Sequence, residues 1–219
     1  MIRTVQLSKS FGTVDAVVEV SFVVPAQGTL TILGPSGSGK TSLLRLIAGL
    51  DLPNAGEIYL DGKLASRPGW SLEPYRRGIG FLFQTPALWP HLTVAQNILF
   101  GLHHLPRPAA RARLEELLEQ MVLCDVANRF PYQVSGGEAR RVSLARTLAP
   151  RPPILLMDEP LINLDLELKE QLMHLIKAAV TRHHATLIYV THDLIEAATI
   201  SQDFLFLEKG RIMRRSNSV

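Results

Sequence analysis

Apolar residues in the N-terminal part of the chain alternate with polar ones or form short runs, a pattern typical of β-strands. Residues 2–7 and 17–24 show this pattern, and Phe11-Gly12 marks a turn between them. Thr29–Leu33 is a short, mainly apolar run that stops at Gly34. We expect two half-buried strands followed by a buried one.

Helical periodicity replaces this pattern at residue 40. Residues 40–50 place apolar side chains on one helical face, namely Leu43, Leu44, Ile47 and Leu50. Two short runs, 57–60 and 79–83, then return to the strand pattern.

The middle of the chain changes character. Residues 107–123 carry apolar side chains at helical spacing, at positions 114, 117, 118, 121 and 122. Residues 138–149 are a second helix candidate, ended by Pro150. The stretch of roughly 85–150 therefore predicts a helical lobe inserted between strands.

The last third alternates strands and helices. Residues 154–157 and 186–190 predict buried strands, 166–183 predict a helix, and 204–207 with the Lys209-Gly210 turn predict a final hairpin. Apolar strands that alternate with helices indicate an α/β fold whose parallel sheet is covered on both faces.

Composition limits the class of protein. The 219 residues, with 47% hydrophobic and 20% charged, fit one globular domain or one domain with an inserted lobe. The single Cys124 excludes an intrachain disulfide framework and favours a reducing setting. A net charge of +3 without a long basic run argues against nucleic acid as a partner. No apolar stretch approaches a membrane span and the N-terminus does not resemble a signal peptide, so we expect any membrane role to need a partner chain.

One glycine-rich loop lies between a predicted strand and a predicted helix. It fits G-x-x-x-x-G-K-[ST], and its residues are Gly34, Pro35, Ser36, Gly37, Ser38, Gly39, Lys40 and Thr41. Glycines let successive N–H groups point inward, and the helix N-terminus adds partial positive charge. Lys40 is placed to meet terminal phosphates, and the Thr41 hydroxyl suits Mg²⁺. The loop predicts a nucleotide phosphate site; a plain glycine-serine turn is the alternative.

A second chemical signal lies where a later strand ends, at Asp158-Glu159-Pro160. Ligands gather beyond the carboxyl ends of parallel strands, so these carboxylates come near the phosphate loop if the two strands are neighbours. Adjacent strand residues point opposite ways. We therefore expect Asp158 to serve Mg²⁺ and Glu159 to orient or deprotonate an attacking water. An acidic strand end that only caps the next helix is the alternative.

His192 follows another predicted strand and is placed to bond a terminal phosphate or to fix the water. Taken alone, a histidine at a strand end is more often a surface or capping residue, and its company here favours the functional interpretation. The other six histidines show no ligand spacing tied to a carboxylate, and we expect them to be structural or solvated.

A second glycine turn opens a helix about 100 residues after the first. It reads Val134-Ser135-Gly136-Gly137-Glu138, and a helix N-terminus of this kind is another anion site. By itself it is also an ordinary capped turn.

Together these motifs resemble those of the ATP-binding cassette (ABC) ATPases, from about residue 2 to residue 213. Residues 34–41 look like Walker A, 134–138 like the signature motif, 154–160 like Walker B, and 161–165 like the D-loop. The resemblance implies a RecA-like P-loop NTPase fold: a mainly parallel sheet with an N-terminal antiparallel β subdomain and an inserted helical subdomain, in one domain over 1–219.

The resemblance also implies a role for each matched residue. Gln84 matches the Q-loop glutamine and His192 the switch histidine, so the expected catalytic residues are Glu159, His192 and Gln84. The expected Mg²⁺ ligands are Thr41, Gln84 and Asp158. The expected ATP-binding residues are Phe11, whose ring is placed to stack on adenine, and Gly34, Pro35, Ser36, Gly37, Ser38, Gly39, Lys40, Thr41 and Ser42.

In this family two cassettes pair head to tail, and each ATP lies between the Walker A of one chain and the signature of the other. The resemblance therefore implies that Ser135, Gly136, Gly137 and Glu138 complete the site of a partner chain. ATP would draw two ATP-binding subunits together, with a homodimer expected, and hydrolysis would release them.

Two positions depart from the family pattern. The signature commonly reads Leu-Ser-Gly-Gly-Gln, and here Val134 and Glu138 stand at its ends. The D-loop commonly has Ser or Ala where Ile162 stands, and a bulky apolar side chain there could alter coupling between the two sites.

Residues 85–101 resemble the segment by which bacterial importer cassettes grip their membrane subunits, and Leu88, Trp89 and Leu92 would line the groove. The favoured function is thus the ATP-binding subunit of an importer at the cytoplasmic face of the membrane, with separate transmembrane permease subunits and a substrate-binding protein as partners. Alternatives are a soluble ABC ATPase of DNA repair or translation, an exporter cassette, or a small-molecule P-loop kinase.

Overall fold

Two β-sheets and the helices packed against them make up the computed structural model, which describes residues 1–162 and 164–217. The first sheet is antiparallel, with strand order β2-β1-β4-β5-β6. Its strands are β1 (Ile2–Phe11), β2 (Val14–Val24), β4 (Ala55–Leu60), β5 (Lys63–Arg67) and β6 (Trp70–Ser71). Ile2 of β1 pairs with Val24 on one side and with Leu60 on the other, so β1 lies inside the sheet.

The second sheet has strand order β11-β10-β3-β9-β8-β7. Its strands are β3 (Thr29–Leu33), β7 (Ile79–Leu82), β8 (Ile154–Asp158), β9 (Thr186–Val190), β10 (Asp203–Glu208) and β11 (Arg211–Asn217). The strands from β10 to β7 pair in parallel, whereas β11 pairs antiparallel to β10. The predicted parallel sheet and closing hairpin are therefore both confirmed.

The parallel sheet is buried on both faces, which explains why its strands are apolar without alternation. Successive side chains of β8 point to opposite faces. Ile154 and Leu156 join the core toward the antiparallel sheet, while Leu155 and Met157 join the core on the other face. Burial of this kind contributes about 1.5–3 kcal/mol for each large aliphatic side chain.

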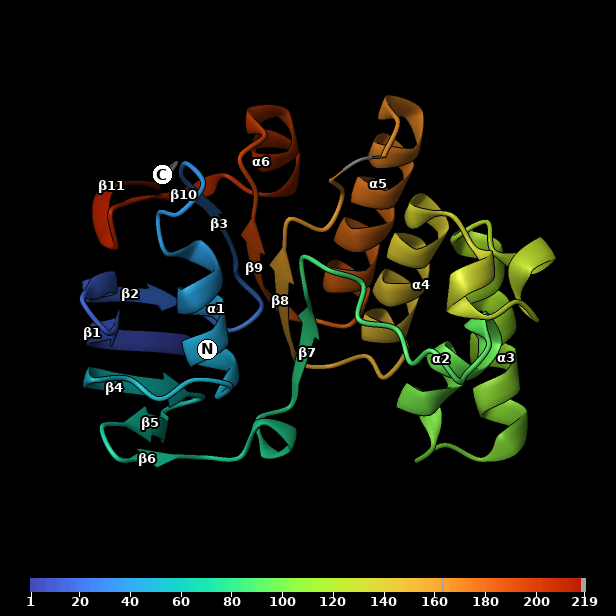
Figure 1. Ribbon diagram of the computed structural model, residues 1–219, viewed down its shortest axis with the longest axis horizontal. Helices are drawn as coiled ribbons and strands as arrows, with labels where there is room; N and C mark the ends of the chain where they lie inside the picture. Colours follow the sequence, from blue (N-terminus) through green and yellow to red (C-terminus); the bar gives the residue numbers. More distant parts are fainter. Residues whose placement is uncertain (163, 218–219) are drawn as a thin grey trace.

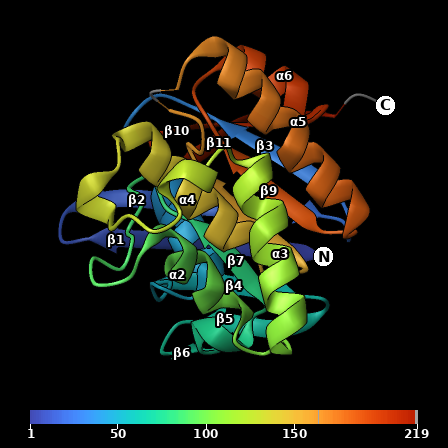
Figure 2. The same cartoon turned by 90° about the vertical axis from the view of Figure 1, so that its right-hand side faces the viewer.

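The helices form two layers around this sheet (Figure 1). Helix α1 (Lys40–Ala48) lies between the two sheets, and α4 (Gly136–Leu148) and α5 (Leu166–Arg182) cover the opposite face. Figure 2 shows α4 and α5, with α2 (Val94–Leu99) and α3 (Arg107–Gln120), in front of the sheets. The remaining helix is α6 (Leu194–Ile200), and the 3₁₀ turns are Pro74–Arg76, Phe100–Leu102, Cys124–Val126 and Pro131–Gln133.

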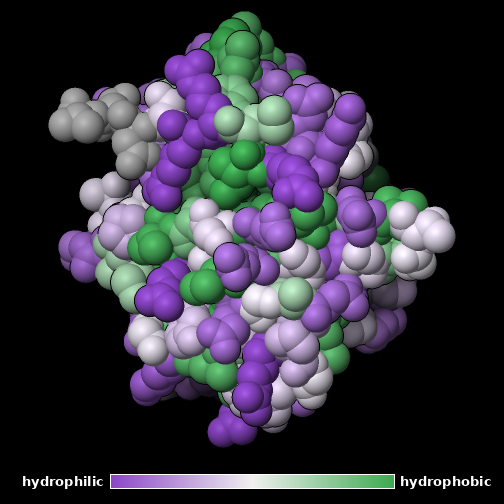
Figure 3. All heavy atoms as spheres, turned by 90° about the vertical axis from the view of Figure 1, so that its left-hand side faces the viewer, coloured by the Kyte–Doolittle hydropathy of each residue, from purple (hydrophilic) through white to green (hydrophobic). Residues whose placement is uncertain are grey.

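The described helices between β7 and β8 occupy the stretch where the helical lobe of roughly 85–150 is expected. Its standing as a subdomain within one domain over 1–219 stays a prediction. Figure 3 looks onto the opposite side of the molecule, formed by the antiparallel sheet and the β10–β11 hairpin, where polar and apolar side chains are interspersed. Of the helices in the described ranges, none has both the length and the apolar character that a bilayer span requires.

Two predicted helices end earlier than their apolar spacing indicates. Helix α1 stops at Ala48 because Gly49 takes a left-handed conformation with φ 79° and donates its N–H to Leu46 and Arg45 carbonyls. Leu50, expected on the apolar face, is consequently 38% exposed. Helix α3 stops at Gln120, and Val122 is 66% exposed for the same kind of reason, with φ 53°.

Candidate nucleotide-binding site

The glycine-rich loop joins β3 to α1, and two of its glycines leave no space for a side chain. A Cβ on Gly34 would lie 2.1 Å from the Leu207 carbonyl oxygen, and one on Gly39 would lie 2.0 Å from the Ala16 carbonyl oxygen. Gly39 also has φ 101° and immediately precedes the helix. The loop is therefore held tightly against β2 and β10, with its backbone facing the cavity described below.

Lys40 is the first residue of α1 and is only 6% exposed. Its Nζ donates to the carbonyl oxygens of Gly34, at 2.7 Å, and Pro35, at 2.8 Å. Burial lowers the pKa of this amine, while the nearby charges of Glu159 and Asp158 act in the opposite sense. The Lys40 side chain thus folds back over the loop and places its own amine against the loop backbone.

A cavity of about 240 Å³ opens beside this loop. It brings Ser36, Gly37, Ser38, Gly39, Lys40, Thr41 and Ser42 together with Gln84 and Glu159, from the ends of β7 and β8. Gly34 and Pro35 take part through their carbonyl groups, which hold Lys40. Phe11 is not among the residues that line the cavity: it ends β1, is 49% exposed and carries the Lys9 amine 5.0 Å from its ring centroid.

Asp158 and Thr41 meet at the edge of this cavity. The Thr41 hydroxyl donates to Asp158 Oδ2 at 2.7 Å, and Asp158 is 3% exposed. Burial raises the pKa of the Asp158 carboxyl, which the Thr41 bond and the Lys40 charge oppose. A hydroxyl, a carboxylate and the Gln84 amide are the hard oxygen donors that Mg²⁺ takes alongside substrate phosphates. The donor set fits that ion, and no cluster of three or more His, Cys, Asp or Glu with metal-site geometry occurs in the described ranges.

The sequence predicts Asp158 near the phosphate loop on the condition that their strands are neighbours, and this condition is wrong. Strands β3 and β8 are not neighbours, because β9 lies between them. Helix α1 instead runs back over the sheet, and its first turn brings Thr41 to the end of β8.

The Glu159 and Asp158 side chains point in different directions because the backbone turns at Glu159. The predicted cause, alternation along a strand, does not apply because the strand has already ended. Strand β8 ends at Asp158, and Glu159 has φ 45° while its N–H donates to the Val190 carbonyl oxygen at 2.9 Å. A non-glycine residue in this region is uncommon and carries a cost of order 1–3 kcal/mol. The turn leaves the carboxylate 12% exposed and able to face two cavities.

His192 adjoins Glu159 on the side away from the phosphate loop. Its Nδ1 lies 3.4 Å from Glu159 Oε1, and its side chain is 60% exposed. Both residues line a second cavity of about 230 Å³ together with Ile162, Lys169, Thr191, Asp193 and Glu196. The structure therefore brings His192 to the predicted base, although the histidine does not line the first cavity.

The signature residues form a capped helix start away from the phosphate cavity. Ser135 is the N-cap of α4; its hydroxyl accepts from the Glu138 N–H at 3.2 Å, and Glu138 Oε2 accepts from the Ser135 N–H at 2.6 Å. Ser135 and Gly136 are exposed, and a Cβ on Gly136 would meet nothing within 4 Å. None of these residues lines the cavity beside Lys40. The D-loop position Asn163 lies outside the described residues.

One residue of the site carries no role in the sequence analysis. Arg140, on α4, is 4% exposed and donates to the carbonyl oxygens of Pro160, at 2.8 Å, and Phe83, at 2.9 Å, and also to those of Gln84 and Glu159. Its guanidinium therefore ties together the two chain segments that bring Gln84 and Glu159 to the cavity. The first residues of β2, 14–16, also line the cavity, and no sequence spacing indicated it.

The glycine-rich loop between β3 and α1 lines a cavity of about 240 Å³, with Lys40 at the start of α1 and Asp158 at the end of a second strand. This arrangement defines a P-loop nucleotide-binding protein. The family model described as ABC transporter matches residues 17–162. The fold is similar to the dimeric bacterial ABC transporter cassette MJ0796, with a TM-score of 0.91, 32% identity, and coverage of 99% of this chain and 98% of that chain. A dimer of the same cassette in a post-hydrolysis state, bound to ADP and Pi, gives a TM-score of 0.89 with the same identity and coverage.

Relatives in sequence belong to import systems. A sulfate/thiosulfate import ATP-binding protein of Gloeobacter violaceus is 44% identical over 94% of this chain, and a spermidine/putrescine import ATP-binding protein of Mesorhizobium japonicum is 43% identical over 97%. The matched part of this chain corresponds to 59% of the length of each of these relatives. This chain belongs to the ABC transporter family, and its fold is that of the family's ATP-binding cassette.

Proposed function

We propose that this chain is the ATP-hydrolysing subunit of a membrane importer. The observation that carries the proposal is the arrangement around one cavity: the phosphate loop, Gln84 and Glu159 line it, while the capped turn at Ser135 lies elsewhere. Such a chain holds one half of a site and exposes a second half for another copy. The import ATP-binding relatives favour import over export or a soluble role.

In this proposal the loop N–H groups and Lys40 bind the ATP phosphates, and Glu159 orients or deprotonates the attacking water. General-base help of this kind is worth about 10²–10⁴ in rate. His192, in contact with Glu159, fixes that carboxylate. Phe11, exposed at the end of β1 beside the residues that line the cavity, offers a ring on which adenine can stack.

Thr41 and Asp158 would hold Mg²⁺, with Gln84 as a further oxygen ligand. The ion, when bound, would neutralise charge on the terminal phosphates. The protein's own part is to hold the Thr41 hydroxyl 2.7 Å from the buried Asp158 carboxylate. Because the Asp158 carboxyl is desolvated there, a bound cation offsets an unfavourable burial.

A second copy of the chain would complete the site with Ser135, Gly136, Gly137 and Glu138. The capping box keeps the Ser135 hydroxyl and the first free N–H groups of α4 at the surface, where a phosphate of the partner's nucleotide can reach them. The two similar cassette structures are dimers, which favours this assembly.

The permease would dock on the aromatic surface formed by Trp89 and Phe100. Trp89 is 45% exposed and Phe100 56% exposed, with their ring centroids 5.7 Å apart. The buried Asn97 amide donates to the Trp89, Leu92 and Thr93 carbonyl oxygens and fixes the loop that carries Trp89. An amphipathic helix of a membrane subunit fits such a surface, which would place this chain at the cytoplasmic face, with a substrate-binding protein completing the importer.

Glu159→Gln tests the catalytic assignment. The variant should bind ATP as the wild type does, stall as an ATP-bound dimer and lose at least about 10²-fold in turnover, because it keeps the shape of the side chain and removes the base. Light scattering with and without ATP and steady-state phosphate release measure the two effects. Undiminished turnover would remove Glu159 from this role.

Ser135→Arg tests whether the site is shared. We expect hydrolysis to be abolished while a single chain still binds nucleotide, because the phosphate loop is untouched. Ser135→Thr, which keeps the capping hydroxyl, is the matched control. Loss of nucleotide binding by the isolated Ser135→Arg chain would contradict a signature that acts on a partner's nucleotide.

A further inference from the structure

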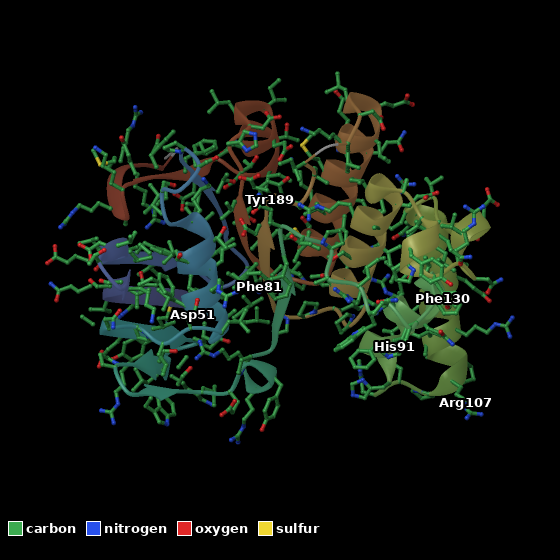
Figure 4. The ribbon with its side chains drawn as sticks, viewed as in Figure 1. Asp51, Phe81, His91, Arg107, Phe130 and Tyr189 are labelled. Carbon is green, nitrogen blue, oxygen red and sulfur yellow. The ribbon has the colours of Figure 1, made fainter. Side chains whose placement is uncertain are left out.

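A buried charged cluster lies beside His192 and has no role in the function proposed above. Its centre is Glu196 on α6, which is 4% exposed. Glu196 Oε2 accepts from the Tyr189 hydroxyl at 2.9 Å and from the Thr191 hydroxyl at 2.9 Å, and Oε1 lies 3.0 Å from Lys169 Nζ on α5. Figure 4 places Tyr189 at the upper part of β9, near α6. Three separate elements therefore meet on one carboxylate.

The cluster holds both backbone neighbours of His192. Thr191 donates its hydroxyl to Glu196 and accepts, on the same oxygen, the Asp193 N–H at 3.0 Å. Asp193 caps α6 by accepting the Ile195 and Glu196 N–H groups, and its other oxygen lies 3.4 Å from Lys169 Nζ. His192 itself projects from between these anchored residues with a side chain that is 60% exposed.

The imidazole is consequently placed by its backbone. Its contact with Glu159, 3.4 Å from Nδ1 to Oε1, involves the ring nitrogen next to Cγ, and the cavity of about 230 Å³ beside the ring leaves room for other orientations. Lys169 neutralises two carboxylates that would otherwise repel each other, Glu196 and Asp193, and it does so from α5, the helix that follows the D-loop. Without Lys169, repulsion between these two carboxylates would favour displacement of the turn at 191–193.

We propose that Lys169 and Glu196 are positioning residues that fix His192 against Glu159. This proposal rests on the proposed function, because it assigns the pair an effect on hydrolysis through His192. If the ion pair were purely structural, its removal would lower stability without acting selectively on hydrolysis. Misplacement of a reacting group by about 1 Å costs on the order of 10²-fold in rate.

The test compares Lys169→Met with Lys177→Met. Lys177 is a matched control on the same helix, and its amine also joins α5 to α6, through the Thr199 carbonyl oxygen at 2.8 Å. We expect Lys169→Met to lower kcat by about tenfold to a hundredfold with KM for ATP changed less than about twofold, and Lys177→Met to leave both near wild type. Lys169→Arg should restore most of kcat, because it keeps the charge that both carboxylates face. Equal effects of the two Met variants would overturn the proposal.

A second arm asks whether the pair acts through His192. In a His192→Ala background, Lys169→Met should lower the residual kcat by less than about twofold, since interactions made through a missing group cannot be lost again. A full independent loss in that background would overturn the proposal. Lys169→Met combined with Glu196→Gln removes both charges; stability should recover toward wild type while kcat stays low.

A third arm does not depend on hydrolysis. The His192 ring resonances of ¹³C-histidine-labelled chain, assigned by their loss in His192→Ala, should shift in Lys169→Met and Glu196→Gln and stay unchanged in Lys177→Met. Unchanged resonances in both pair variants would overturn the proposal. If Lys169→Met does not fold, Glu196→Gln and Lys169→Arg carry the same comparison. A wild-type chain without ATPase activity would refute the proposed function, and this arm would still decide whether the pair places His192.

Discussion

Replacing Gly39 by alanine perturbs the phosphate loop at the point where it enters α1. The added Cβ would lie 2.0 Å from the Ala16 carbonyl oxygen and 3.6 Å from the Gly210 Cα. Gly39 also has φ 101°, outside the small left-handed region that L-residues reach. Either the loop or β2 has to move. Movement of the loop would also disturb the hydrogen bond from the Gly210 N–H to the Ser38 carbonyl oxygen, at 3.0 Å.

The magnitude follows from two terms. A positive φ costs about 1–2 kcal/mol for a residue with a Cβ, and overpacking against a backbone atom adds about 1–3 kcal/mol. The free energy of unfolding should therefore fall by about 2–5 kcal/mol, which lowers Tm by roughly 4–20 °C in a chain of this size. Nucleotide affinity should fall as well, because Gly39 lines the cavity.

Gly37 is the control within the same loop. It has φ 77°, yet a Cβ there would meet nothing within 4 Å. Gly37→Ala should cost only about 1–2 kcal/mol, because it carries the cost of a positive φ without the overpacking. Urea unfolding followed by circular dichroism gives both free energies, and a fluorescent ATP analogue gives the affinities. Equal destabilisation by the two substitutions would refute the claim that close backbone approach at Ala16 sets the shape of the loop.

Three further outcomes are expected. Arg77→Met should lower the free energy of unfolding by at least about 3 kcal/mol in urea melts, because the buried guanidinium donates to carbonyl and hydroxyl oxygens of β5, β6 and α1 that would lose their partner. Glu116→Gln should cost at most about 1 kcal/mol at pH 7. The hydrogen bond from Arg113 lowers the Glu116 pKa in the folded chain. The stabilisation from the Glu116 carboxylate is therefore fully present above its pKa in the unfolded chain and is lost as pH falls through its pKa in the folded chain. The free energies of unfolding of wild type and Glu116→Gln should converge in acid. Trp89→Ala should change Tm and basal ATPase little and abolish co-elution with the permease; retained co-elution would move the docking surface elsewhere.

The strands buried on both faces are the elements that the sequence predicts best. Thr29–Leu33 and Thr186–Val190 begin and end where expected, because a short apolar run between polar residues has one way to be buried in a parallel sheet. The two-residue β6 and the partly exposed β5 gave no such signal. Helices α2 and α6 were missed because six or seven residues do not establish a helical period.

The site shows a similar division. Local motifs place the phosphate loop and the two carboxylates at the end of β8, since each motif is continuous in sequence. The separation of Glu159 from Asp158 depends on a positive φ that the Val190 carbonyl oxygen supports, and this contact comes from the neighbouring strand. Arg140 could not be distinguished from Arg141 beside it, because both belong to a helix without a marked apolar face; only the fold shows that Arg140 is buried against the carbonyl groups after β7 and β8.

Arg140 also bears on how the two halves of the proposed site communicate. It lies on α4, the helix whose N-terminus is the capped turn at Ser135, and its guanidinium holds the backbone at Gln84 and Glu159. One rigid helix therefore begins at the surface proposed to face a partner's nucleotide and is fixed, little more than one turn later, to the edge of this chain's own cavity. A displacement of that helix by a partner's nucleotide has to move either the Gln84 and Glu159 carbonyl groups or the guanidinium that binds them. Since a buried guanidinium that loses its acceptors is costly, the carbonyl groups are expected to follow, and Glu159 with them.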